Sequence, residues 1–377
     1  MNFELTEERQ MLQDGLRRYL RESYTPTLRA ELAESDHGYA QNVWSGLAEM
    51  GVIGALFDEE IGGFAGSGFD IAVVFEELGR VGAVDPLIDT AILGGGLIAA
   101  LGNEAQKQII EAVIDGSIQL AFAHGEPSSR YDLSRIEATA TRHGDEFILN
   151  GRKAVVINAP AADHIVVSAR TSGDAADRDG ISLFLVSASN PGMTLRSYPL
   201  VSGCQAAELL LEDVRLGSDA LLGGEGGAFE AITHTQARAT LAISAEALGL
   251  MESIRELTND YLKTRKQFGK PIGKFQALQH RMADVLIEIE QARSAVINLA
   301  GHIDAPAEIR EKHVSATKNL IGNVAKLVTE ESIQMHGGIG MTDEYELGHL
   351  AKRLIMVDHR FGDAIYHLER FIALAVA

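Results

Sequence analysis

Ionisable side chains crowd one stretch near the carboxyl end, VDHRFGDAIYHLER at residues 357–370. This stretch places Asp358, His359, Asp363 and His367 around one glycine, Gly362. A carboxylate or imidazole held against a weak carbon acid can serve as a general base. Asp363 precedes a helical pattern, so we expect it to cap the following helix, and we expect Asp358 and His359 to face solvent or an interface.

A basic segment, TRKQFGKPIGKFQ at residues 264–276, has the side chains to bind a pyrophosphate. Arg265 offers a planar fork of donors, and Gln267 adds neutral donors. The glycine after Phe268 is expected to end the helix, which would leave that ring free to lie against a flat ligand. Basic residues near a helix end also occur simply to offset the helix dipole, so both interpretations stay open.

A glycine pair follows a helical pattern in IQMHGGIGM, residues 333–341. Gly337 and Gly338 allow backbone N–H groups to approach an anion closely, and Gln334 lies one turn earlier. The same pair could be only a helix-ending loop. His336 is expected to be part of that loop, because no spacing of His and Cys in the chain suggests a metal site.

One carboxylate interrupts an otherwise apolar pattern, Glu246 in ATLAISAEALGLM. An unpaired charge in such a helix would be costly, so Glu246 needs either a basic partner or a raised pKa. A structural pair is the more frequent outcome, and a catalytic role is the alternative.

The elements that position these residues fall into three segments. Apolar spacing predicts helices over 1–116, short β-branched runs predict an antiparallel sheet over 117–218, and the helical period returns over 219–377. Asn150-Gly151, between DEFIL and RKAVVI, predicts a tight hairpin. The fold class is therefore α+β and mainly α, with a helical domain, a middle β domain and a carboxyl-terminal helical bundle.

Composition excludes several classes of protein. The formal charge of -20 disfavours nucleic acid and anionic membrane surfaces as partners. No apolar run reaches the roughly 20 residues that span a bilayer. The single cysteine, Cys204, cannot form an internal disulfide, and MNFELTEERQ lacks the pattern of a secretory signal, so we expect a cytoplasmic protein.

Taken together, the order of segments and three motifs resemble the acyl-CoA dehydrogenases. The motifs are FELTEERQMLQDGLRRYL, RKQFGKPIGKFQALQHRMAD and QMHGGIGMTDEYEL, and the resemblance covers essentially the whole chain. It implies FAD-dependent α,β-dehydrogenation of an acyl-CoA, with electron-transfer flavoprotein as the usual electron acceptor. It also implies that FAD pyrophosphate and adenosine bind across a subunit interface at Arg265, Gln267, Phe268, Gln276, Gln334, Gly337 and Gly338.

The segment that contacts the flavin ring in that family is less well matched. In AFAHGEPSSRYD the resemblance implies that Phe122 and His124 contact the flavin, and Glu126 and Pro127 match the family motif. Departures from the family pattern occur where threonine, serine, tryptophan and a second threonine are usual, at Gly125, Tyr131, Val155 and Ile157. These changes remove hydroxyl donors and an aromatic wall.

The catalytic glutamate of the commonest family members falls on Phe361, which cannot abstract a proton. A second location used in the family falls on Ala239. Glu246 and Asp363 are the remaining candidates for a base within this chain.

The ending DHRFGDAIYHLERF and the helix ATLAISAEALGLMESI resemble small subunits of heteromeric acyl-CoA dehydrogenases of the pimeloyl-CoA dehydrogenase type. In such assemblies a paralogous large subunit can supply the base. A homotetramer that uses Glu246 or Asp363, and a non-catalytic flavin-binding scaffold, are the alternatives. A DNA-associated branch of the superfamily is disfavoured by the acidic balance.

Overall fold

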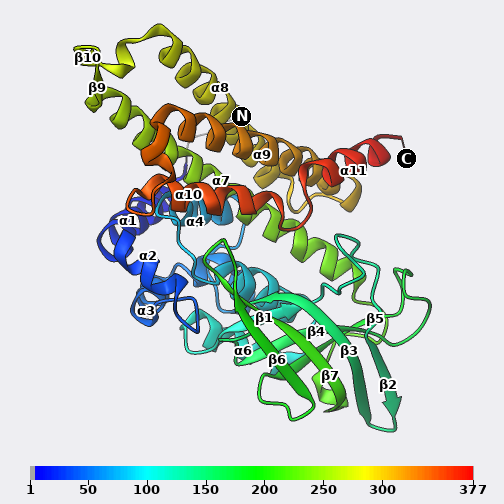
Figure 1. Cartoon of the computed structure of the whole chain (residues 1–377). Coiled ribbons are helices and arrows are strands. Elements are labelled where there is room, and N and C mark those ends of the chain that lie inside the picture. Colours follow the sequence, from blue (N-terminus) through cyan, green and yellow to red (C-terminus); the bar gives the residue numbers. More distant parts are fainter. Residues whose placement is uncertain (1–4, 377) are drawn as a thin grey trace. The chain divides into compact units, whose positions relative to one another are not determined.

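The computed structural model describes residues 5–376 and begins with helices (Figure 1), several of which carry side-chain caps at their N-termini. The Thr6 hydroxyl accepts the Arg9 N–H at 3.4 Å, and Asn103 and Gln106 form a reciprocal capping box. A π-helical stretch, Ile88–Gly95, precedes α5. The helices are α1 (Glu7–Ser23), α2 (Pro26–Ala33), α3 (Gln41–Glu49), α4 (Gly68–Arg80), α5 (Gly96–Leu101) and α6 (Glu104–Ile114).

A single sheet follows, ordered β6-β7-β3-β2-β4-β5-β8, with β1 paired to β4. Most neighbours are antiparallel, as expected, but β1 and β2 each pair with β4 in parallel. Alternating residues bury one face, where Phe147 and Phe184 pack edge to face at 5.0 Å between ring centroids. The strands are β1 (Leu120–Ala123), β2 (Thr139–His143), β3 (Glu146–Ile157), β4 (His164–Arg170), β5 (Ile181–Ser187), β6 (Met193–Pro199), β7 (Gln205–Gly217) and β8 (Leu221–Leu222).

The hairpin predicted at Asn150-Gly151 was wrong. Both residues lie inside β3, and the turn between β2 and β3 is formed by Gly144 and Asp145. Gly144 has φ +62°, as a tight turn of this kind requires, whereas Gly151 lies at a shift in the register between β3 and β7. The Asn150 side chain bonds to Asp213 of β7, so its polar group is satisfied across strands.

The remaining helices confirm the predicted carboxyl-terminal helical domain. They are α7 (Phe229–Thr264), α8 (Gln276–His302), α9 (Ala307–His336), α10 (Glu346–Asp358) and α11 (Ala364–Val376). Helix α9 contacts α8, α10 and α11. A short hairpin of β9 (Lys266–Gln267) and β10 (Lys270–Pro271) stands at the end of the α7–α8 pair (Figure 1).

Compactness divides the described residues into two units. The helical unit comprises the chain up to Arg29, Ser67–Ala83 and the chain from Thr240 onward, and the sheet unit comprises Ala30–Gly66 and Val84–Ala239. The three predicted segments follow secondary structure, whereas compactness groups α1 and α4 with the carboxyl-terminal helices.

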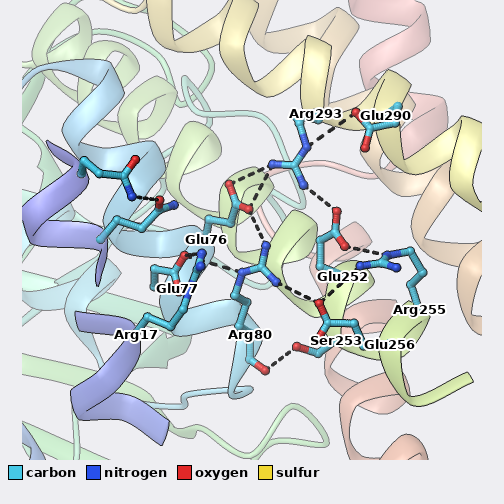
Figure 2. A network of polar contacts seen from close by, with 12 residues as sticks. Arg17, Glu76, Glu77, Arg80, Glu252, Ser253, Arg255, Glu256, Glu290 and Arg293 are labelled. Atoms are coloured by element: carbon cyan, nitrogen blue, oxygen red, sulfur yellow. Dashed lines mark hydrogen bonds and ion pairs between the residues drawn. The ribbon is translucent and has the colours of Figure 1, made fainter. Parts of the chain in front are cut away.

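An ion-pair network joins four helices of the helical unit, α1, α4, α7 and α8 (Figure 2). Arg293 of α8 bonds to Glu76 of α4 at 3.1 Å and to Glu252 of α7 at 2.6 Å. Arg17 of α1 bonds to Glu77 of α4. The network therefore ties elements that are more than 200 residues apart in sequence.

Among the residues that the structure describes, no helix is both long and apolar enough to cross a membrane.

Candidate functional site

The basic segment forms the β9–β10 hairpin. Helix α7 ends at Thr264, five residues before Gly269, so the expectation that this glycine ends the helix was wrong. Phe268 and Gly269 form the turn, with φ +53° and +78°. The Phe268 side chain is 89% exposed. The ring is therefore exposed, as predicted, but because it lies at the tip of a hairpin and not because a helix ends there.

Arg265 lies at the base of that hairpin. Its N–H donates to Tyr261 O at 2.8 Å, and its carbonyl accepts from Ile272 N–H at 2.9 Å. The backbone is thus fixed on both sides. Within the described residues the Arg265 guanidinium makes no hydrogen bond or ion pair, and it is exposed together with Gln267 and Gln276. Five donors are therefore available to an anionic ligand.

The glycine pair follows the last residue of α9. Gly337 has φ +67° and caps the helix by donating to Ile333 O. A Cβ built on Gly337 or Gly338 would meet no described heavy atom within 4 Å. Gln334 is exposed one turn earlier. The backbone of the pair is therefore open to close approach, as a phosphate-binding turn requires.

The expectation that His336 is part of a loop was wrong. It is the last residue of α9 and is 4% exposed, and its ring stacks on Tyr261 at 4.5 Å between centroids. Tyr261 precedes Arg265 by one helical turn. The basic segment and the glycine pair thus lie on either side of one direct ring contact within the helical unit.

Phe122 lies in β1, and His124 directly follows that strand in the sheet unit. The two rings stack at 5.2 Å, and His124 Nδ1 lies 3.0 Å from the Ser168 hydroxyl. Burial, together with the charge of Lys153, lowers the pKa of His124 to about 3, so the imidazole is neutral at ordinary pH. His124 is therefore enclosed by this unit, whereas Phe122 is half-buried.

Sequence reasoning missed the buried charge beneath these rings. Lys153 donates to Glu126 at 2.7 Å, to Ser168 at 3.0 Å and to the His124 carbonyl at 3.3 Å. Burial lowers the pKa of Lys153 to about 8, opposed by the Glu126 carboxylate. The only signal in the sequence was a lysine at an inward position of β3, between Leu149 and Val156. Through these bonds Lys153 and Glu126 hold the backbone of the AFAHGE segment in place.

Val155, which the sequence resemblance aligns with a family tryptophan, has a left-handed backbone with φ +52°. Its N–H donates to the Glu208 carboxylate at 3.2 Å, and the Tyr198 hydroxyl donates to the same oxygen at 2.7 Å. A β-branched residue in this region is strained, and such strain is frequent at functional sites. The Val155 side chain is 54% exposed, so it is not held there by packing.

Phe361, which the sequence resemblance assigns to the usual base position, lies on a loop fixed by α9 and α11. His367 Nε2 donates to the Phe361 carbonyl at 2.9 Å, and Lys318 donates to the Gly362 carbonyl at 2.7 Å. Burial lowers the pKa of His367 to about 4 and that of Lys318 to about 8. Asp358, expected to face away, instead accepts the Ala364 N–H at 3.0 Å. The loop is rigidly positioned, yet it presents an aromatic ring.

Both candidate carboxylates have partners inside the chain. Glu246 is 5% exposed and accepts from Arg353 of α10 at 2.7 Å, which is the structural pairing that its apolar surroundings called for. Asp363 accepts the Tyr366 N–H at 2.8 Å and caps α11. A catalytic role for either residue stays a prediction. No group of three or more possible metal ligands occurs among the residues described.

The residues present fit FAD better at its dinucleotide end than at its ring end. The exposed Arg265 and the open turn at Gly337-Gly338 suit a pyrophosphate. At the ring end, Gly125 and Ile157 supply no hydroxyl donor.

Comparison with known proteins agrees with this geometry. Models of the N-terminal, middle and C-terminal domains of acyl-CoA dehydrogenase match residues 6–116, 121–214 and 226–358. A probable acyl-CoA dehydrogenase, YngJ of Bacillus subtilis (strain 168), is 30% identical over 99% of this chain and 98% of its own length.

Two solved structures extend the likeness to the fold. Butyryl-CoA dehydrogenase from Megasphaera elsdenii is 28% identical with a TM-score of 0.91, and the match covers 100% of both chains. A variant of a steroid acyl-CoA dehydrogenase, named Tcur3481-Tcur3483, is 30% identical with a TM-score of 0.87 over 98% of both chains. The chain belongs to the acyl-CoA dehydrogenase family, as a flavin-dependent oxidoreductase that acts on CH–CH bonds with FAD as its cofactor.

Proposed function

We propose that this chain is the small subunit of a heteromeric acyl-CoA dehydrogenase, and that a paralogous large subunit supplies the catalytic glutamate. When bound, FAD supplies the oxidant that takes a hydride from the β carbon of the acyl group. The α proton must leave to a base, and the observation that carries the proposal is the aromatic side chain at the usual base position, Phe361.

The two other carboxylates support the same division of labour. Glu246 is neutralised by Arg353, and removing either partner would leave a buried charge. Asp363 bonds to the backbone at the start of α11. Both carboxylates therefore already have bonding partners within this chain. The similar steroid enzyme carries a two-component name, which is consistent with an enzyme built from unlike chains.

In this proposal the chain contributes the residues that bind the pyrophosphate and adenosine of FAD. Arg265 and Gln267 would bind the pyrophosphate, the Phe268 ring would lie against the adenosine, and Gly337-Gly338 would let the backbone approach it. Because the Phe268 ring is almost fully exposed, a second subunit is needed to enclose the ligand. Electron-transfer flavoprotein is the proposed electron acceptor, and the assembly would work in the cytoplasm.

Anaerobic titration with acyl-CoA thioesters tests the proposal. The chain is purified alone and with a co-expressed longer homologue that keeps the glutamate, and each sample receives straight-chain, branched, dicarboxylic and steroidal thioesters. We expect the flavin to bleach and an artificial dye to be reduced only in the mixed assembly. Sustained turnover by the lone chain would contradict the need for a partner.

The lone chain also distinguishes the alternatives. If it turns over, loss of activity in Glu246→Gln or Asp363→Asn, with the melting temperature unchanged, would identify a base within a homotetramer. A flavin that no thioester bleaches, in either sample, would indicate a scaffold.

A further inference from the structure

We propose that Tyr261, His336 and Tyr345 form an aromatic lock that sets the spacing between the two dinucleotide-binding segments, so that His336 is a positioning residue for the adenosine half of FAD. The inference rests on the proposed assignment of Arg265–Phe268 and Gln334–Gly338 to the dinucleotide.

The three rings form one compact cluster. His336 stacks on Tyr261 at 4.5 Å with an interplanar angle of 23°, and it lies 5.2 Å from the Tyr345 ring. Tyr345 meets Tyr261 edge to face at 6.4 Å. Aromatic pairs at such separations contribute stability beyond the area they bury. The cluster brings together the end of α7, the end of α9 and the start of α10.

Hydrogen bonds fix the orientation of the central ring. His336 Nδ1 lies 2.8 Å from the Ser332 carbonyl. A carbonyl only accepts, so Nδ1 carries the proton and Nε2 of the neutral ring accepts from the Tyr345 hydroxyl at 3.3 Å. Burial lowers the pKa of His336 and so favours the neutral form of the ring. The ring therefore cannot rotate without losing both bonds.

Each side of the lock leads directly into one binding segment. The Tyr261 carbonyl accepts the Arg265 N–H, at the base of the hairpin that carries Gln267 and Phe268. His336 is bonded covalently to Gly337, and its Cβ lies 3.0 Å from the position that a Cβ on Gly340 would occupy. A shift of the imidazole would thus move the glycine turn relative to Arg265. Misplacement of binding groups by an ångström can weaken a site greatly.

A second stacked histidine supplies a matched control. His302 and His313 stack at 3.9 Å between α8 and α9. His313 lies 23 residues before His336 on the same helix, roughly 34 Å away by helix rise. His313→Ala therefore removes a stacked imidazole from the same helix, far from the binding segments.

The test measures dissociation constants of FAD, of ADP and of FMN, which lacks the adenosine half. They are determined by equilibrium dialysis on the flavin-free chain and on its mixed assembly. His336→Ala should weaken the binding of FAD and ADP about tenfold or more, because the imidazole loses both aromatic contacts and both hydrogen bonds, and it should leave FMN binding unchanged. His336→Phe, which keeps the stacking, and Tyr345→Phe, which loses one hydroxyl, should weaken FAD only a few-fold. His313→Ala should leave the dissociation constants of all three ligands unchanged.

The outcomes separate the lock from the proposed function. If His336→Ala weakens FAD binding no more than His313→Ala does, or weakens FMN binding to the same extent, the cluster is ordinary core packing and the inference fails. Acyl-CoA turnover by the wild-type assembly would be unaffected by that result, so the proposed function would remain. If wild type binds no FAD in either form, the dinucleotide assignment itself is wrong.

Discussion

At the scale of single residues, the loop at Phe361 is held in position by its main chain, whereas any chemistry would depend on the side chain at 361. Its backbone is held by His367 and by Lys318, whose ammonium group is buried against two carbonyls. These contacts involve only main-chain oxygens at 358, 361 and 362. The side chain at 361 can therefore change without dismantling the loop.

Phe361→Glu should give the lone chain a base. We expect dehydrogenation of a suitable thioester, at saturating FAD, to rise about a hundredfold above Phe361→Gln, in line with the usual contribution of a general base. Phe361→Gln is the matched control, because it has the shape of glutamate without its basicity. Equal rates for the two variants would show that the loop does not face the substrate.

The exposed residues of the candidate site could be proposed from the sequence, whereas the residues held in buried contacts could not. Arg265 and the pair Gly337-Gly338 carry their chemistry in residue type and local spacing. His336 was misplaced because its partners, Tyr261 and Tyr345, are identified only once α7 and α9 pack together. Lys153 was missed for the same reason, since its partner Glu126 lies 27 residues away.

At the scale of elements, β3 shows how tertiary context overrides turn chemistry. Asn150-Gly151 is a strong hairpin signal. In the sheet, however, Asn150 pairs with β2 and Gly151 pairs with β7, and the Asn150 side chain bonds to Asp213. Gly144-Asp145 provides the actual turn. The register of β3 shifts again between Lys153 and Val156, and this irregularity is what places Val155 in its left-handed conformation.

Val155→Asn should stabilise the flavin-free chain by about 1 kcal/mol, because asparagine tolerates a left-handed backbone at lower cost than a β-branched residue. Chemical denaturation measures the change. Val201→Asn is the control, since Val201 is also exposed but has no positive φ, and it should stay within about 0.5 kcal/mol of wild type. A loss of stability in Val155→Asn would mean that the exposed side chain makes a contribution that the strain argument omits.

At the scale of the whole molecule, the sequence predicted the three segments but not the grouping of α1 and α4 with the carboxyl-terminal helices. Helical periodicity identifies which face of a helix is buried, but it does not identify the helix that covers that face. Here that choice is marked by charges. Arg17 pairs with Glu77, and Arg293 pairs with both Glu76 and Glu252, across helices distant in sequence (Figure 2).

Arg293→Gln should destabilise the chain by about 2 kcal/mol at neutral pH, because it leaves the largely buried Glu252 and Glu76 with fewer partners. Arg281→Gln on the same helix is the control. Its pair with Glu331 is more exposed, at 3.2 Å, and should contribute at most about 0.5 kcal/mol. Equal losses in the two variants would contradict a special role for the network.

The gap between wild type and Arg293→Gln should also depend on pH. Burial raises the pKa of Glu252, but Arg255 and Arg293 outweigh it and hold the pKa below its ordinary value. A carboxyl with a depressed pKa in the folded state stabilises the fold above its unfolded pKa of about 4.3, and this stability is lost as pH falls through the folded pKa. Urea titrations at descending pH should therefore show the gap widest near neutrality and closing below about pH 4. A gap that stays constant into acid would show that Arg293 stabilises the bundle by packing its side-chain stem and not by charge.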